Sequence, residues 1–344
     1  MKSQSFLRGM IASVAVCFIG AQAWASSDVS NQGAPSATVA ASVSSSAAVQ
    51  TGNIISGAIG GGFSGGGFSS SNQTSDAGTQ VGRSAGNDKS GNSVWAQGDA
   101  SVVHKYEDSL RLHGTIYSGV VGFGHEFLDR YTVGLAADYE SVSLKTAYNN
   151  GKSDETGSSL IPYVAVKLTP SVTWDLAGGY SWLDYKTDRQ NGAVKGDYSA
   201  NRWFGSTNLV GAYSLGDFRF QPRAGVSFSS ERHDGYRETG SSTSYIGADT
   251  SNSGIATMGT KIGYPIGNGT PYVKVMGEWD FVTSESVLKA NRQMSDKDRL
   301  GAVVGLGYEY SFNGVTASLE LNDNAVFRQN LDAYTATARL RWQF

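Results

Sequence analysis

The sequence has 344 residues, a net charge of -3 and only 17% charged residues, so it offers no basic surface for nucleic acid. Glycine is abundant, with 44 residues against 6 prolines, and tyrosine contributes 17 residues. After the first 25 residues no apolar run approaches the ~18 residues that a spanning helix needs. This composition excludes a bundle of membrane helices and leaves two all-β classes, a soluble β-protein and a transmembrane barrel.

The amino-terminal stretch has the three parts of an export signal. Lys2 and Arg8 form a short basic region, and residues 10–20 form an apolar one. Ala23-Trp24-Ala25 then supplies a small-x-small cleavage pattern. We therefore predict a signal peptide over 1–25, cut between Ala25 and Ser26.

Residues 26–92 differ in composition from everything that follows. Ser, Ala, Gly, Thr and Asn dominate this segment, and Phe63 and Phe68 are its aromatic residues. Such a segment cannot bury enough apolar area to offset its ordering entropy, so we expect it to be disordered on its own. Its Gly60-x-Gly62-x-x-Gly65 pattern matches a dinucleotide fingerprint, but no βαβ unit surrounds it. We interpret 26–92 as a low-complexity linker or short passenger.

From Trp95 onward, apolar and polar residues alternate with the period of two that is typical of β-strands. The last segment shows this best, because Tyr334, Leu340, Trp342 and Phe344 share one face while arginines occupy the other. Similar alternation covers 131–139, 172–182, 218–228, 273–281 and 300–312.

Two features favour a membrane barrel over a soluble sandwich. Aromatic residues gather at strand ends, where interfacial girdles lie; the pairs are Tyr131 with Tyr139, Trp174 with Trp182, and Trp203 with Tyr213. Connections also alternate between short and long, and the long polar ones are expected near 145–159, 186–200, 229–254 and 283–298. Counting strands between the connections predicts twelve, with short turns on the periplasmic side.

With these features, residues 93–344 resemble the autotransporter outer-membrane β-barrel (translocator) domain family. The resemblance rests on Ser93-Val94-Trp95-Ala96, Val133-Gly134-Leu135-Ala136, Gly179 to Tyr185, Arg202-Trp203-Phe204, and the closing Ala338 to Phe344. It implies a twelve-stranded antiparallel transmembrane β-barrel, preceded by the Ser/Ala/Gly-rich segment, in the outer membrane of a Gram-negative bacterium.

The resemblance also implies a function and partners. We expect a non-enzymatic translocator that threads its short amino-terminal segment through or into the pore, so that 26–92 lies in the pore or at the cell surface. The alternative is a small passive pore or structural outer-membrane protein with no secretion role. The expected partners are outer-membrane lipid, the barrel-assembly machinery and periplasmic chaperones, and we expect a monomeric barrel that binds no nucleic acid.

The sequence offers no convincing catalytic or metal-binding set. The sole cysteine, Cys17, lies in the predicted leader, which removes disulfides and thiolate sites from the mature chain. His233 and Asp234, beside Glu231, are expected in the longest loop, where we interpret them as solvated polar residues. His125 lies beside a short turn and is expected to be structural. We therefore expect no enzyme activity, cofactor or metal.

Charged residues on the inward faces of the predicted strands form the candidate lumen. They have two interpretations, a hydrated pore that grips a polypeptide and a filling that holds a small barrel rigid. The predicted lumen charges are Asp138, Glu140, Asp175, Arg219, Arg223, Lys274, Glu278, Asp280, Glu309, Glu320, Arg339 and Arg341.

The final strand resembles the signal that the outer-membrane assembly machinery reads. Phe344 is aromatic, and apolar residues precede it at alternate positions, among them Trp342, Leu340 and Tyr334. This strand is also expected to close the barrel against the first strand, because an open edge cannot persist in hydrocarbon.

Overall fold

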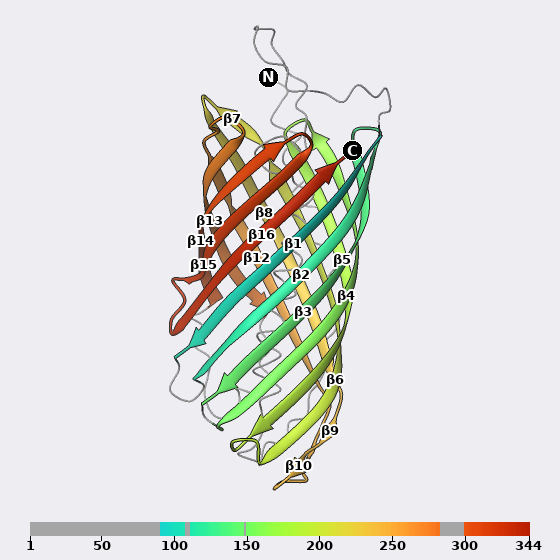
Figure 1. The fold of residues 1–344 in the computed structure, drawn as a ribbon, viewed down its shortest axis with the longest axis vertical. Helices are drawn as coiled ribbons and strands as arrows, with labels where there is room; N and C mark the ends of the chain where they lie inside the picture. The colour runs from blue at the N-terminus through green and yellow to red at the C-terminus, as the bar shows by residue number, and fades with distance from the viewer. Residues whose placement is uncertain (1–89, 107–110, 148, 283–298) are drawn as a thin grey trace. The chain divides into compact units, whose positions relative to one another are not determined.

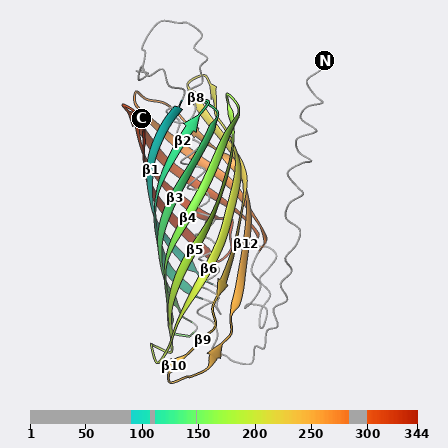
Figure 2. The same cartoon turned by 90° about the vertical axis from the view of Figure 1, so that its right-hand side faces the viewer.

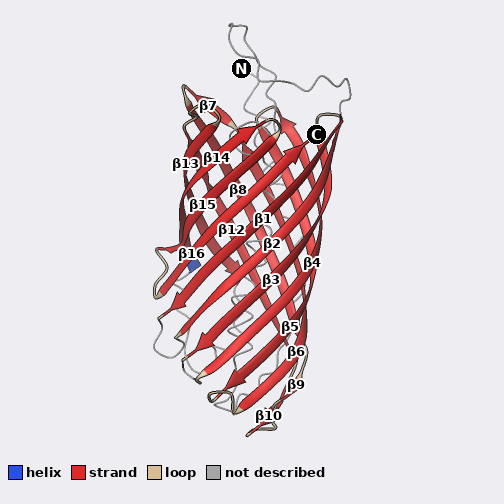
Figure 3. Ribbon diagram, viewed as in Figure 1, coloured by secondary structure: helices blue, strands red, loops and turns tan. Residues whose placement is uncertain are grey.

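The computed structural model describes residues 90–106, 111–147, 149–282 and 299–344. In these ranges twelve long antiparallel strands form one sheet that closes on itself as a barrel (Figures 1 and 3). The predicted twelve-stranded all-β barrel is confirmed. The predicted signal peptide and residues 26–89 lie outside the described residues.

Four short strands accompany the twelve long ones. No helix in the described ranges is long and apolar enough to cross a membrane. The long strands are β1 (Ser90–Lys105), β2 (Leu112–Phe127), β3 (Tyr131–Thr146), β4 (Gly151–Thr169), β5 (Val172–Arg189), β6 (Val194–Gly211), β8 (Phe218–His233), β12 (Asp249–Gly263), β13 (Gly269–Val282), β14 (Leu300–Phe312), β15 (Val315–Val326) and β16 (Leu331–Gln343). The short ones are β7 (Tyr213–Leu215), β9 (Tyr236–Arg237), β10 (Thr239–Gly240) and β11 (Tyr245–Ile246).

The barrel closes where its first strand meets its last. β1 and β16 pair from Ser93 opposite Gln343 to Lys105 opposite Leu331, and they run side by side in Figure 1. Asn92 and Phe344 extend the seam with reciprocal backbone hydrogen bonds of 2.8 and 3.0 Å. The expected closure of the last strand against the first is therefore present.

The two ends of the barrel differ in their connections. The turn end carries Phe344 and the short connections β2–β3, β4–β5, β6–β8, β12–β13 and β14–β15; the loop end carries the others. One of the two-residue turns at this end is Asn313-Gly314, whose φ angles of 48° and 78° are both left-handed. Both residue types tolerate that conformation, and the resulting type I′ turn matches the twist of a hairpin.

The outer surface of the barrel carries an apolar belt. Outward-facing Leu176, Val273 and Leu306 are exposed along its height, as expected for side chains that contact lipid. Tyr139, Trp182 and Trp203 are exposed on the loop-end side of this belt, and the register brings the strands that carry them together. Tyr131, Trp174 and Tyr213 border it on the turn-end side.

Three of the four long polar connections that were predicted, those near 145–159, 186–200 and 229–254, are mostly strand, and the fourth, 283–298, lies outside the described residues. β3 runs to Thr146 and β4 starts at Gly151, β5 and β6 leave only 190–193 between them, and β8 continues to His233. The loop prediction was wrong because it weighed the outward residues, such as Lys152, Asp154 and Thr156, which are polar beyond the aromatic belt. Their inward neighbours remain ordered on the interior face, so the pairing continues past the membrane.

The wall of the barrel is therefore uneven in height. β4 has 19 residues and β5 and β6 have 18 each, whereas β14, β15 and β16 have 13, 12 and 13. A tilted strand needs only about 9–11 residues to span a bilayer. Figures 1 and 2 show β4–β6 reaching furthest at the loop end, where β9 and β10 adjoin them.

We predict that the cost of an arginine on the outer surface depends on its depth. Leu306 lies mid-strand in β14 and is 64% exposed, so Leu306→Arg should lower the unfolding free energy by about 2–4 kcal/mol. Leu300 lies on the same face at the loop end of the same strand, where Leu300→Arg should lower it by only ~0–1 kcal/mol. Reversible urea unfolding in lipid vesicles measures both values. Equal losses at the two depths would contradict a membrane position for this belt.

Candidate functional site

The charged residues predicted to face the lumen all lie on the interior side of the wall. In their strands they alternate with outward-facing neighbours, and none of them is exposed. Asp138, Glu140, Asp175, Glu309 and Glu320 are buried; Arg219, Arg223, Lys274, Glu278, Asp280, Arg339 and Arg341 are half-buried. Both signs of charge therefore share the interior and can pair across it.

A single arginine joins four strands inside the barrel. Arg202 of β6 donates from Nη1 to Glu140 of β3 at 2.7 Å, from Nη2 to Glu155 of β4 at 2.9 Å, and from Nε to Glu231 of β8 at 2.8 Å. All four side chains are 1% exposed. The planar guanidinium can serve three acceptors at once because its donors point in fixed, divergent directions. We call these four residues the Arg202 cluster.

Glu231 extends the cluster toward the loop end. Its Oε1 accepts a hydrogen bond of 2.5 Å from the hydroxyl of Tyr185 and lies 2.6 Å from Nε2 of His233. His233 and Glu231 were expected to be solvated in a loop, and that expectation was wrong, because both side chains are buried in β8. Asp234 follows the strand and is exposed, so it does not form a catalytic pair with His233.

A second interior network lies on the carboxy-terminal strands. Glu320 of β15 accepts hydrogen bonds from Lys261 of β12 at 2.8 Å and Lys274 of β13 at 2.6 Å. The hydroxyl of Tyr272 adds a bond of 2.7 Å and the amide of Asn322 one of 3.0 Å. Two opposite charges on one carboxylate compensate its burial.

Further polar networks lie at the β1–β16 seam and near the loop end. Thr337 donates to Asp99 at 2.5 Å, and Arg339 donates to Gln97 at 2.7 Å, so side chains reinforce the backbone pairing of the two strands. Arg328 donates to Asp280 at 2.6 Å and, through another nitrogen, to Glu278 at 3.2 Å.

Several residues of these networks were missed in the sequence. Arg202 was noted within a resembling motif but not as a lumen residue, although its neighbour Trp203 already marked the outward face. Glu155 and Glu231 lie in segments that were expected to be loops, 145–159 and 229–254. Lys261 lies in β12, whose Gly- and Thr-rich sequence alternates weakly. These residues could have been predicted by continuing the period-two alternation of each strand beyond the aromatic residues at its end.

The wall formed by β1–β6 is apolar above and below the Arg202 cluster. On the turn-end side, Trp95 and Tyr163 pack with neighbours, and Trp95 Nε1 donates to the Tyr163 hydroxyl at 3.0 Å. A side chain at Gly122 would collide with the Trp95 ring and one at Gly134 with the Tyr163 ring, so these glycines let large rings lie flat on the wall. The interior of this half therefore combines packed apolar groups with the charged residues that the sequence predicted.

A second apolar group lies on the loop-end side of the cluster. Leu112, Val142, Leu144 and Leu183 are buried there together with Tyr185, Tyr198 and other inward residues. Tyr185 stacks on Tyr198 with ring centroids 4.8 Å apart, and Tyr198 stacks at the same distance on Tyr236 of β9. These contacts explain why β3–β6 stay paired beyond the membrane.

Side-chain and backbone hydrogen bonds hold the segment between β8 and β12 against β5 and β6. Arg189 of β5 donates from Nε and Nη2 to both oxygens of Glu238 at 2.8 and 2.7 Å. These hydrogen bonds hold the pKa of the Glu238 carboxyl below its usual range. β10 pairs with the start of β6, with Thr239 opposite Lys195. The longest connection among the described residues is thus held against the barrel.

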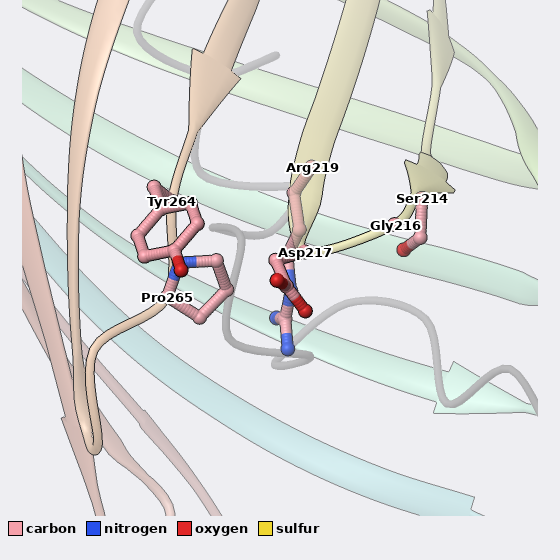
Figure 4. A pocket seen from close by; sticks show the side chains of 6 residues that line it. All are labelled: Ser214, Gly216, Asp217, Arg219, Tyr264 and Pro265. Atoms are coloured by element: carbon pink, nitrogen blue, oxygen red, sulfur yellow. The ribbon is translucent and has the colours of Figure 1, made fainter.

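A cavity of about 410 Å³ lies at the turn end (Figure 4). It is lined by Ser214, Gly216, Asp217, Arg219, Tyr264 and Pro265, from the β7–β8 turn and the start of the β12–β13 connection. Arg219, one of the predicted lumen charges, is among the residues that line this cavity. In the described ranges no group of three or more His, Cys, Asp or Glu residues has the geometry of a metal site.

We predict that removing the central guanidinium destabilises the barrel strongly. Arg202→Met leaves three buried carboxylates without their shared cation, and breaking such an ion pair costs about 3–5 kcal/mol. Arg232 of β8 is exposed on the outer face, so Arg232→Met should change the unfolding free energy by less than ~0.5 kcal/mol. Urea unfolding in vesicles compares the two variants. A loss with Arg202→Met no larger than with Arg232→Met would show that the cluster adds nothing to stability.

Comparisons with known proteins agree with this architecture. The family model "Autotransporter beta-domain" matches residues 94–322, which is more than half of the sequence. The chain is similar to the translocator domain of the autotransporter NalP from Neisseria meningitidis, with 14% identity, a TM-score of 0.60, and coverage of 74% of this chain and 88% of that one.

It is also similar to the β-domain of the Bordetella autotransporter BrkA, with 15% identity, a TM-score of 0.59, and coverage of 74% and 99%. No curated protein matches the sequence. At these identities the solved structures show a shared fold, and the family model shows membership. The chain therefore belongs to the autotransporter beta-domain family, the non-enzymatic outer-membrane barrels of Gram-negative bacteria that serve passenger secretion.

Proposed function

We propose that this barrel carries the segment 26–92, up to the start of β1 at Ser90, through or into its lumen toward the cell surface. The observation that carries the proposal is the contrast between the two faces of the wall. The outer face is apolar and contacts outer-membrane lipid. The inner face holds charged networks that offer hydrogen-bond partners to a polypeptide backbone that crosses the barrel.

The orientation of the barrel supports the same proposal. Short turns of outer-membrane barrels lie on the periplasmic side, so the turn end is placed there. β1 starts at this end, since Asn92 pairs with Phe344. A segment that precedes β1 and reaches the cell surface must then cross the barrel once.

The twelve predicted lumen charges are proposed to line that path. Those on β13–β15, such as Lys274, Glu309 and Glu320, lie on other strands than the apolar clusters of β1–β6. A polar segment is expected to contact the charged side, because its backbone gains hydrogen bonds there. The same charges also pair with one another, so the lumen is both rigid and polar.

Export to the periplasm is proposed to depend on the leader. The pattern Ala23-Trp24-Ala25 supports removal of 1–25, with Ser26 as the first mature residue. Mass spectrometry of the amino terminus of envelope-extracted protein checks this cut, and an intact Met1 would contradict it.

Assembly is proposed to involve periplasmic chaperones and the outer-membrane barrel-assembly machinery, which read the last strand. Tyr334, Leu340, Trp342 and Phe344 are exposed on the outer face, and Trp342 and Phe344 pack with ring centroids 4.5 Å apart. Because the outward face of β16 is apolar, it can enter the lipid while the edge of the same strand pairs with β1.

We predict that the segment 26–92 becomes accessible on intact cells. An epitope inserted after Pro35 should bind antibody without permeabilisation, because the barrel is proposed to pass this region outward. An epitope at Gly247, exposed at the loop end, is the external control, and one beside Pro170, in the β4–β5 turn, is the periplasmic control. Protection of the Pro35 epitope alongside normal controls would favour the alternative, a passive pore or structural barrel.

We predict that deletion of Phe344 lowers the amount of folded barrel in the outer membrane and raises periplasmic degradation. The deletion removes an outward aromatic residue and the two backbone hydrogen bonds to Asn92 that close the seam. Heat-modifiable migration on gels measures the folded fraction. As a control, deletion of one residue from 26–89, ahead of β1, should leave assembly unchanged. Equal assembly of both deletions would remove Phe344 from the assembly signal.

A further inference from the structure

On the outer face of β4–β6, beyond the aromatic belt, charged side chains alternate in sign from strand to strand. Lys186 of β5 lies opposite Asp154 of β4 and Asp197 of β6. The next row outward repeats the pattern with the signs reversed, and its members are Lys152, Asp188 and Lys195. Opposite charges on facing strands stabilise a sheet, whereas like charges there destabilise it. This part of the wall therefore compensates its own outward charges.

The outward side chains of β1–β4, which run side by side in Figure 1, do not follow this rule. His104 of β1 faces His113 of β2. His113 in turn faces Lys145 of β3, which faces Lys152 of β4. All four lie on the outer face and are exposed or half-buried. We call these four residues the basic row, and in the register no acidic residue stands between them.

Acids meet the basic row only at its ends among the described residues. Asp332 of β16 faces His104. At the other end the Asp154 carboxylate lies 2.6 Å from the Lys152 ammonium, and the two side chains are 40% and 42% exposed. An exposed ion pair of this kind contributes little. The centre of the row faces no acid on the neighbouring strands, so its donors are open to an anion from outside.

The height of the row above the membrane indicates which anion this is. Tyr117 and Tyr139 mark the loop-end aromatic level of β2 and β3, and they are 56% and 57% exposed. His113 lies four residues beyond Tyr117, and Lys145 lies six residues beyond Tyr139. At ~3.3 Å per residue and a tilt of about 35–45°, these steps rise roughly 9–11 Å and 14–16 Å along the barrel axis. The headgroup region of an ordinary bilayer is only about 5–8 Å deep on each side, so a phospholipid phosphate does not reach the row.

The chemistry of the row fits several phosphates on a larger headgroup. Ammonium and imidazole N–H groups donate to phosphate oxygens, and charge-assisted hydrogen bonds of this kind are strong. The row crosses three strand gaps of about 4.8 Å and so extends over roughly 14 Å, which is too long for one phosphate. The outer leaflet of a Gram-negative outer membrane is rich in glycolipid, whose headgroup is a chain of phosphorylated sugars.

We propose that the basic row binds the phosphorylated saccharide headgroup of an outer-leaflet glycolipid and holds that lipid against β1–β4. The inference depends on the outer-membrane position of the barrel and on the loop end facing outward. It does not depend on secretion of the segment 26–92, so it goes beyond the proposed function.

Binding is measured on the full-length, heat-modifiable barrel in detergent. The protein is titrated with lipopolysaccharide that carries phosphorylated core sugars, and native mass spectrometry gives the dissociation constant. Lys145→Gln with Lys152→Gln removes two charges from the row and leaves the inner face of the wall unchanged. The dissociation constant should rise about 30-fold, because each lysine near an anionic lipid surface contributes about fivefold.

The matched control removes the same charge from the loop end of β5 and β6. Lys186 and Lys195 already face aspartates, so Lys186→Gln with Lys195→Gln should raise the dissociation constant by less than about threefold. Lys145→Arg with Lys152→Arg should bind as the unmodified protein does, because a guanidinium also donates to phosphate.

The choice of lipid identifies the ligand. Lipopolysaccharide from which the phosphates have been removed should bind the unmodified protein about as weakly as the intact lipid binds the Lys145/Lys152 glutamine variant. Phosphatidylglycerol should bind no more tightly, because its phosphate lies too close to the hydrocarbon. Millimolar inorganic phosphate should not displace the intact lipopolysaccharide.

Several results would overturn the inference. Equal losses in the two glutamine variants would reduce the effect to net charge, and no loss in either would mean that the row is compensated within the protein, including by 107–110, which lies outside the described residues. Full binding of the dephosphorylated lipid or of phosphatidylglycerol would remove the saccharide phosphates as the ligand. Displacement by inorganic phosphate would make this a site for a soluble anion. Loss of binding on chelation of divalent metal, without loss in the Lys145/Lys152 glutamine variant, would assign the contact to a metal bridge.

The epitope experiment separates these outcomes from failure of the proposed function. A protected Pro35 epitope removes secretion and leaves the lipid site unaffected. If the Pro170 epitope is accessible on intact cells and the Gly247 epitope is not, the basic row faces the periplasm and the glycolipid cannot be its ligand.

Discussion

Closure of the sheet is the constraint on which the rest of this structure depends. Inside a bilayer every backbone amide and carbonyl must pair within the protein, and a β-sheet satisfies that requirement only when its first and last strands meet. The pairing of β1 with β16 joins residues from opposite ends of the barrel domain, whereas the other long strands pair with neighbours in sequence. Hydrogen bonds from Thr337 to Asp99 and between the hydroxyls of Ser101 and Thr335 reinforce the seam from inside. The Arg202 cluster and the Glu320 network lie on either side of this seam, on β3–β8 and β12–β15.

Closure also divides the lumen into two unlike sides. The β1–β6 side is packed with apolar groups, and the Arg202 cluster lies between them and ties β3, β4, β6 and β8 together. The carboxy-terminal side carries the Glu320 network and the arginines of β16. An apolar, well-packed wall resists deformation, while the charged side remains available to a polar polypeptide. This division accommodates both interpretations of the lumen charges, since rigidity and a polar path belong to different sides.

The tall part of the wall follows from the same packing. Beyond the aromatic belt the outward residues of β3–β6 become polar, yet the inward residues Val142, Leu144, Leu183 and Tyr198 stay apolar and bury one another. Their packing keeps the strands paired above the membrane and provides the surface on which Tyr236 stacks. Among the described residues, no buried apolar cluster of comparable size lies on the short strands β14–β16, which end close to the belt.

The sequence by itself determined the all-β class, the number of strands, the inward or outward side of most residues and the apolar belt, because each follows from alternation along a single strand. It placed Asp138, Glu140 and Glu320 on the inner face for the same reason. Only the tertiary structure decided which charges meet, since Arg202 and its three glutamates come from four strands whose register no single segment encodes. It also decided where the strands end, because Glu155 and Glu231 look like loop residues until the inner core that buries them has closed.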